Sequence, residues 1–62
     1  MGAAYQVDPH RDHIGGPYWA LAEPWQRPIG EPVAITHDHQ VIPAVTVAQL
    51  NGRTIVNTEA AR

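Results

Sequence analysis

Four histidines are the most concentrated source of chemistry in this sequence, and they form two close pairs, His10 with His13 and His37 with His39. Residues two apart on a strand project from the same face, so the second pair could present two imidazoles to one ion. The first pair could converge on a turn. Together the pairs could hold zinc or another divalent metal tetrahedrally, with neighbouring aspartates orienting the rings. The alternative is two solvated turns that carry histidine by chance.

Other reactive side chains are scarce. The chain has no Cys, Ser or Lys, which excludes thiolate metal sites, serine nucleophiles and Schiff-base lysines. The carboxylates show no paired arrangement suited to acid–base catalysis. They are Asp8, Asp12, Glu23, Glu31, Asp38 and Glu59. We therefore expect no enzymatic activity.

The charge pattern also narrows the possible partners. Four arginines stand against six acids, for a formal net charge of −2, and the arginines are dispersed rather than gathered into a basic stripe. Nucleic-acid binding is therefore not expected. The start of the chain lacks the pattern of a signal peptide, and the longest weakly polar stretch, 41–50, is about half a membrane span. We expect a soluble protein of the cytoplasm or of a virion, without membrane insertion.

The elements that must position these residues fall into two segments. Residues 1–32 contain five of the six prolines and four of the five glycines. Because both residue types interrupt regular structure, this segment is expected to be an extended arm with at most one helical turn near 18–23. Tyr18, Trp19 and Trp25 are its large aromatic side chains, and aromatic residues of these types are common anchors at protein interfaces. The alternative is that they pack on the sheet as the small core of this chain itself, and both hold if the arm is shared between copies.

Residues 33–62 change character, since β-branched residues dominate in the runs 33–36, 41–47 and 54–56. We expect a three-stranded antiparallel meander. Asn51-Gly52 predicts a two-residue type I′ turn that pairs 50 with 53, 48 with 55 and 47 with 56. A similar turn at Asp38-His39 would pair 35 with 42 and 33 with 44. Pro43 predicts a bulge or a break in the middle strand, because proline cannot donate to the ladder.

This register makes both faces of the meander apolar. One face carries Val33, Ile35, Ile42, Ala44, Ala48, Leu50 and Ile55, and the other carries Ala34, Thr36, Val41, Val45, Val47 and Val56. A free-standing sheet of this kind normally has one solvated face, so a partner chain is expected to cover part of the second face. The predicted partner-binding residues are Tyr18, Trp19, Trp25, Val41, Val45, Val47 and Val56. The alternatives are a register error of one residue on one strand, or exposure of the small residues Ala34 and Thr36 to solvent without a partner.

Residues 30–47, GEPVAITHDHQVIPAVTV, resemble the strand–turn–strand segment of Phd/YefM-type antitoxins. In that family an amphipathic helix precedes the hairpin, and basic residues contact DNA. Here PWQRP precedes it, the net charge is negative, and Asn51-Gly52 turns the chain back into another strand where the family continues into a helix. The sequence is therefore not assigned to that family.

The sequence favours a small, mainly-β, non-catalytic structural or accessory subunit that is ordered within a larger assembly, with other chains or copies of itself as partners. The most specific form of this hypothesis is a virion component such as a capsid decoration or connector protein. The alternatives are a histidine-metal binding module, an antitoxin-type regulatory binding protein and an accessory subunit of an enzyme complex.

Overall fold

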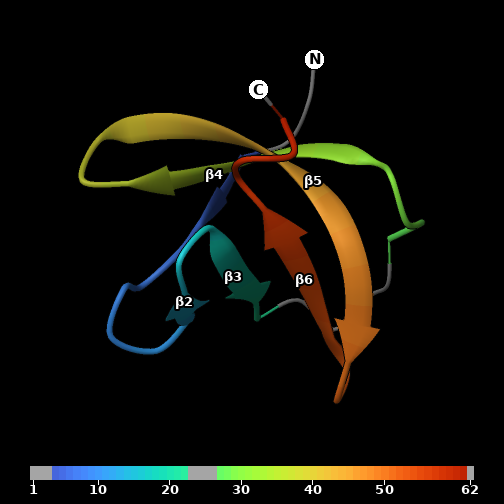
Figure 1. Cartoon of the computed structure of the whole chain (residues 1–62). Coiled ribbons are helices and arrows are strands. Elements are labelled where there is room, and N and C mark those ends of the chain that lie inside the picture. Colours follow the sequence, from blue (N-terminus) through green and yellow to red (C-terminus); the bar gives the residue numbers. More distant parts are fainter. Residues whose placement is uncertain (1–3, 23–26, 62) are drawn as a thin grey trace.

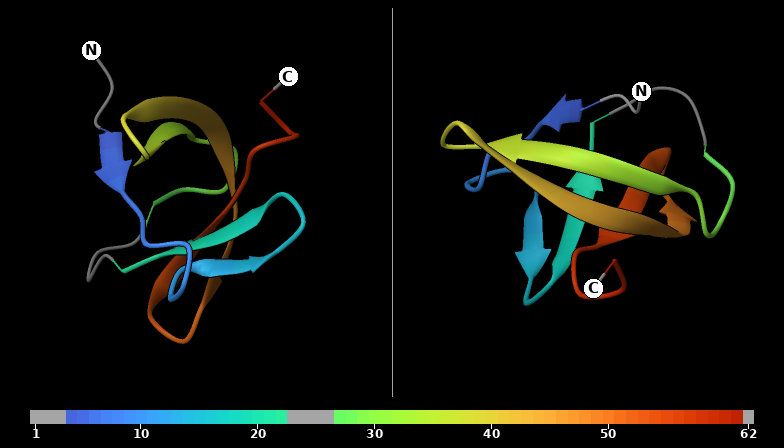
Figure 2. Two further views of the ribbon diagram at one scale, coloured as in Figure 1. Left: turned by 90° about the vertical axis from the view of Figure 1, so that its left-hand side faces the viewer. Right: turned by 90° about the horizontal axis from the view of Figure 1, so that it is seen from above.

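The computed structural model describes residues 4–22 and 27–61, which form one curled, mixed sheet of six strands (Figures 1 and 2). The strands are β1 (Ala4–Gln6), β2 (His13–Gly15), β3 (Tyr18–Leu21), β4 (Pro32–His37), β5 (Gln40–Leu50) and β6 (Arg53–Asn57). Their order across the sheet is β1-β4-β5-β6-β3-β2. The expectation of a small, mainly-β protein is confirmed. The described residues include no helix that could span a membrane.

Both predicted turns form and set the register next to them. Asp38 and His39 have φ angles of 53° and 62°, while Asn51 and Gly52 have angles of 53° and 76°. Positive φ at both central residues is the mark of the type I′ turn, whose twist matches that of the flanking strands. The pairs 35 with 42, 33 with 44, 50 with 53 and 48 with 55 occur as expected.

A bulge in β5 alters the register beyond Ala48. Thr46, rather than Val47, lies opposite Val56, and the register shifts between Thr46 and Ala48. The extra residue moves the following side chains to the opposite face. The predicted pairing of 47 with 56 is therefore wrong.

The bulge also splits both predicted faces of the meander. Of the first face, Val33, Ile35 and Ala44 are buried in the core. Ala48 and Leu50 lie beyond the bulge and alternate with inward residues, so they belong to the outer side of the sheet. Ile55 lies opposite Ala48 on that side but is only 8% exposed, so it is buried there. The apolar pattern on both predicted faces thus arises in part because the side chains of β5 change sides of the sheet at the bulge between Thr46 and Ala48.

Pro43 lies inside an unbroken strand rather than at a bulge. Residues 37 and 40 close the turn as a hydrogen-bonded pair, and the pair types alternate along the hairpin from there. Pro43 and Ala34 are three pairs further on and form a non-hydrogen-bonded pair. The nitrogen of Pro43 therefore points away from β4. On its other side β6 ends at Asn57, which is opposite Val45, so Pro43 has no partner strand there and its missing N–H removes no ladder hydrogen bond.

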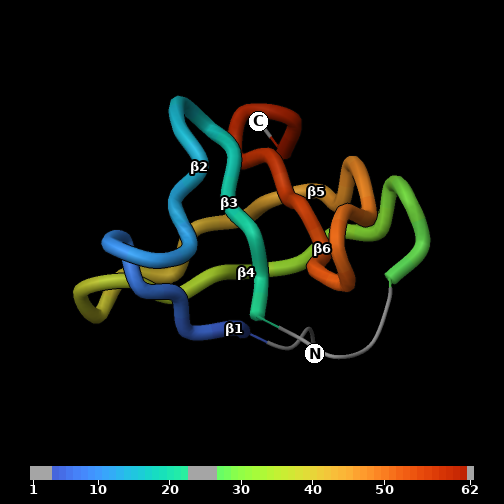
Figure 3. The backbone as a smooth tube through the Cα atoms, turned by 90° about the horizontal axis from the view of Figure 1, so that it is seen from below, coloured from blue at the N-terminus to red at the C-terminus, as the bar shows by residue number. Residues whose placement is uncertain are grey.

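The first 32 residues supply three of the six strands, where an extended arm was expected. β1 pairs in parallel with β4, β3 pairs antiparallel with β6, and β2 pairs with β3 at the far edge. Figure 3 shows these segments wrapping around the strands of the second half. Residues 18–21 are a strand rather than a helical turn. Each strand has only three or four residues, too few for a local pattern to reveal it.

The core lies inside the curled sheet. Val7 and Leu21 from the first half pack with Val33, Ile35, Ala44 and Val56 from the second half. Tyr5, Trp19 and Ile42 are partly buried against this cluster. The segment before residue 32 therefore closes the core of the second segment.

Candidate functional site

The outer side of the sheet carries a surface without charged side chains. Three rows of paired positions form this surface, because residues that alternate with the core residues on each strand must face outward. The rows are Gln6, Thr36 and Val41; Ala4, Ala34 and Pro43; and Pro32, Val45, Asn57 and Tyr18. We call these ten positions the outer face. Beyond the β5 bulge the same side of the sheet continues into a mostly buried row, Ala20, Ile55 and Ala48, and then into Leu50 and Arg53, which are not counted with it.

Much of the outer face is open to solvent. Val41 is 66% exposed and Tyr18 is 43% exposed. Pro32 and Pro43 are exposed, while Ala34 and Val45 are half-buried. A sheet face in water normally carries polar or charged side chains that oppose association with other sheets. Seven of the ten residues here are Ala, Val, Pro or Tyr, and none is Asp, Glu, Lys, Arg or His.

The predicted partner-binding residues divide between this face and the interior. Val41, Val45 and Tyr18 belong to the outer face. Val47 is half-buried at the bulge. Val56 is 0% exposed, so it cannot face a partner, because the bulge turns it into the core. Trp25 lies outside the described residues.

Trp19 faces inward and is engaged within the chain. Its ring stacks on that of His13, with centroids 4.5 Å apart, and contacts the ring of His37 in a tilted arrangement at 6.0 Å. The ring of His13 is also held by its Nε2, which lies 2.9 Å from the carbonyl oxygen of Gly16. Trp19 thus joins β2, β3 and the end of β4, which is an internal packing role.

The structure does not bring the four histidines together. His13 and His37 each contact Trp19, whereas His10 and His39 are exposed in separate turns. Within residues 4–22 and 27–61, no three side chains of His, Asp or Glu come together as a set of metal ligands. His13 and His37 are strand residues that contact the Trp19 ring, whereas His10 lies in the turn before β2 and His39 in the β4–β5 turn.

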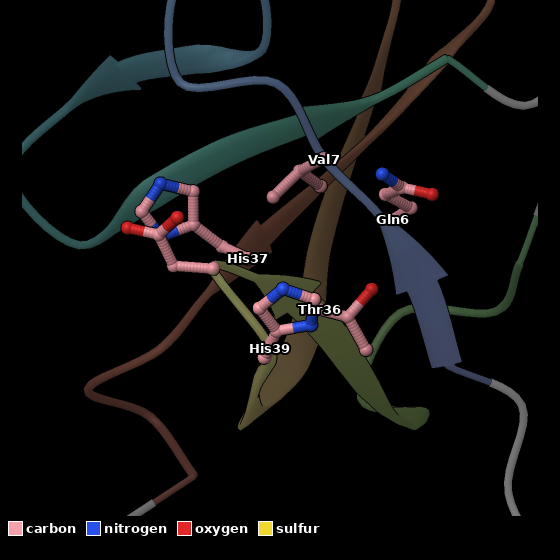
Figure 4. Close-up of a pocket in the computed structure, with 6 residues that line it drawn as sticks. Gln6, Val7, Thr36, His37 and His39 are labelled. Carbon is pink, nitrogen blue, oxygen red and sulfur yellow. The ribbon is translucent and has the colours of Figure 1, made fainter.

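A pocket of about 430 Å³ lies between the end of β1 and the β4–β5 turn (Figure 4). Gln6 and Val7 form one wall, and Thr36, His37 and His39 lie on the hairpin opposite, together with Asp38. Val7 is the one apolar residue in this lining. Small-molecule sites are predominantly apolar with a few polar groups, and this lining has the reverse balance. The outer face is therefore the stronger candidate for a functional surface.

Arg53 forms a polar link that the sequence did not reveal. Its guanidinium donates to Oδ1 of Asp12 at 2.7 Å and to the carbonyl oxygen of Ala20 at 2.8 Å, so the side chain reaches across β3. Asp12 is 8% exposed, and its Oδ2 accepts a hydrogen bond from the backbone N–H of Asp8 at 2.8 Å. This link fixes the turn before β2 against β6. Residues 12 and 53 are too far apart in sequence for spacing to indicate the pair.

A second polar cluster lies beside the far half of β5. Arg27 donates to Glu31 at 2.7 Å, and its guanidinium lies 4.8 Å from the centre of the Tyr5 ring. Gln49 donates both to the carbonyl oxygen of Arg27 and to Oγ1 of Thr54. These contacts tie the segment before β4 to the sheet. The ion pairs of Arg27 with Glu31 and of Arg53 with Asp12 therefore connect segments of the fold and do not involve the outer face.

Comparison of this chain with protein-family models, with curated proteins and with solved structures finds no match.

Proposed function

We propose that this chain is a non-catalytic structural or accessory subunit that docks onto another protein through its outer face. The observation that carries the proposal is the absence of charge from ten outward positions on a solvent-exposed sheet surface. Burial of such a surface releases water from apolar groups without removing any ion from water. Most charged side chains of the described residues lie in turns and connections, and Arg53, which is on the same side of the sheet beyond the bulge, is paired with Asp12.

The size of the outer face favours an assembly with several contacts over an isolated pair of proteins. Strands lie about 4.8 Å apart and alternate residues about 6.8 Å apart, so ten positions cover roughly 330 Å². A standard stable interface buries about 800 Å² on each partner. Because the outer face is smaller than this standard area, it is either the centre of a larger interface or one of several small interfaces on the chain. Repeated weak contacts of this kind are sufficient where many copies act together.

In its most specific form, the proposal is a virion component such as a capsid decoration or connector protein. An accessory subunit of an enzyme complex is the other form, and it uses the same surface. Both forms require a protein partner and no catalytic group on this chain.

Site-specific photo-cross-linking in the native particle or cell tests the proposal. A photoreactive amino acid is placed at Val41 or Pro43 on the outer face, and at Ile29 as a control. Ile29 is matched to Val41 because it is apolar, 65% exposed and outside the outer face. We expect both outer-face positions to give an adduct of one discrete mass, and Ile29 to give none. Equal labelling from all three positions, or no adduct from the outer face, contradicts the proposal.

A further inference from the structure

The turn between β5 and β6 places an asparagine in a setting suited to spontaneous deamidation. Asn51 and Gly52 are both exposed at the tip of the hairpin. No described residue forms a hydrogen bond with the Asn51 side chain, and the backbone nitrogen of Gly52 makes none in the turns and loops of the described residues. The electrophilic carbon and the nucleophilic nitrogen of the reaction are therefore both accessible.

The reaction requires only these two residues and water. The backbone nitrogen of Gly52 attacks the side-chain amide carbon of Asn51, forms a five-membered succinimide and releases ammonia. Water then opens the ring at either carbonyl and leaves aspartate or isoaspartate. Glycine favours the attack because it has no Cβ to block it and because its backbone reaches conformations closed to other residues.

Asn57 is the other asparagine of the chain and provides an internal comparison. Its Oδ1 accepts hydrogen bonds from the backbone N–H groups of Glu59 at 2.8 Å and Ala60 at 3.1 Å. The nitrogen that would attack it belongs to Thr58, a β-branched residue, and donates to the carbonyl oxygen of Pro17 at 3.0 Å. At Asn57 the side chain is therefore held in one orientation and the attacking nitrogen is engaged elsewhere, whereas no such bond within the described part of the chain restrains either group at Asn51.

The product would disturb the element that follows the turn. Isoaspartate adds one methylene to the backbone, and a two-residue type I′ turn cannot accommodate it without moving the pair Leu50 and Arg53. Arg53 also holds Asp12 and the carbonyl oxygen of Ala20. A displacement of Arg53 would therefore weaken its hydrogen bond to Asp12 and so loosen the turn before β2.

We infer that Asn51 is a site of spontaneous deamidation and that isoaspartate at this position loosens the β5–β6 hairpin and the Arg53–Asp12 link. This inference does not depend on the proposed function, since it needs no partner and no use of the outer face.

Ageing of the purified full-length chain at mildly alkaline pH tests the inference. Peptide mass mapping measures amide loss at each asparagine, and an isoaspartate methyltransferase assay identifies the isomer. We expect conversion at Asn51, with isoaspartate as the main product, retention of the amide at Asn57, and a lower melting temperature for the aged fraction. The control is Asn51→Gly, which keeps a residue suited to positive φ and has no side-chain amide. It should show no isoaspartate and no decline in melting temperature on ageing.

Retention of the amide at Asn51, or conversion of Asn57 at the same rate, overturns the assignment of the site. Conversion at Asn51 without any change in melting temperature overturns the structural consequence. If the melting temperature of aged Asn51→Gly falls by the same amount, the loss of stability has another cause. That result also overturns the structural consequence.

Discussion

At the scale of single residues, two buried threonines on paired strands differ in one hydrogen bond. Thr46 and Thr54 are 1% and 0% exposed. Oγ1 of Thr54 accepts a hydrogen bond from Gln49, whereas Oγ1 of Thr46 has no partner among the described residues. Burial of an unpaired hydroxyl costs free energy, and valine has nearly the same shape without that group.

Thr46→Val should therefore raise the free energy of unfolding by about 1 kcal/mol. The matched change, Thr54→Val, should lower it by about 1 kcal/mol, because one amide hydrogen of Gln49 loses its acceptor. Urea denaturation of both variants measures the two effects. Destabilisation of similar size in both variants would show that the hydroxyl of Thr46 is satisfied in solution.

Removal of the Arg53 guanidinium should cost more than removal of an exposed arginine. Arg53→Met leaves the Asp12 carboxylate with the N–H of Asp8 as its remaining donor. We expect a loss of about 1–2 kcal/mol, because the Arg53 side chain is 36% exposed and solvent screens part of the interaction. The control, Arg11→Met, changes an exposed arginine and should cost less than about 0.5 kcal/mol. Denaturation curves for both variants measure the two losses. Equal, small losses would show that the Arg53–Asp12 pair is an incidental surface contact.

At the scale of elements, the two hairpin turns share a geometry but differ in their residues. Asn51-Gly52 is the preferred pair for a type I′ turn, whereas Asp38-His39 places histidine at a φ of 62°. A left-handed conformation costs free energy for a residue that has a Cβ. Replacement of Asp38-His39 by Asn-Gly should therefore stabilise the protein by about 1 kcal/mol.

The reciprocal replacement of Asn51-Gly52 by Asp-His is the control for that prediction. It should destabilise the protein by a similar amount, which thermal and urea denaturation can measure. If both exchanges destabilise the protein, then contacts made by the residues 38 and 39 outweigh their backbone cost.

The same contrast explains which elements could be predicted from the sequence. Both turns and the pairs beside them follow from local chemistry, namely the alternation of apolar residues and the residue types that tolerate positive φ. The bulge at Thr46–Ala48 has no such signal, since Thr-Val-Ala continues the strand pattern. β1 and β3 are defined by pairing with the distant strands β4 and β6, and β2 pairs only with β3, across a turn at Gly16-Pro17 and with a register shift.

The candidate site was predictable only in part, for the same reason. Val41 and Val45 lie before the bulge and face outward as the register of the β4–β5 hairpin requires. Val56 was placed on the same face and is buried, because one additional residue in β5 reverses the orientation. Tyr18 joins the outer face through Asn57, which depends on β3, a strand that the sequence did not reveal.

At the scale of the whole molecule, the curled sheet requires its first half to complete the core. Leu21 is 2% exposed, Val7 is 6% exposed, and both pack with residues of β4, β5 and β6. Without them, the inner sides of Ile35 and Val56 would face water. Three strands with one open apolar face lack the buried area that a domain of this size needs.

A peptide of residues 27–62 should therefore fail to fold cooperatively, although it retains both type I′ turns and three of the six strands. Circular dichroism and thermal melting should show no cooperative transition for this peptide alone. Addition of a second peptide, residues 1–22, should restore the transition, since it carries β1, β2 and β3 together with Val7, Asp12 and Leu21. The same second peptide with Leu21→Asp is the control and should not restore it, because a carboxylate would be buried in the core. A cooperative transition for residues 27–62 alone would mean that the β4–β6 meander is an independent folding unit, with the first three strands added to its surface.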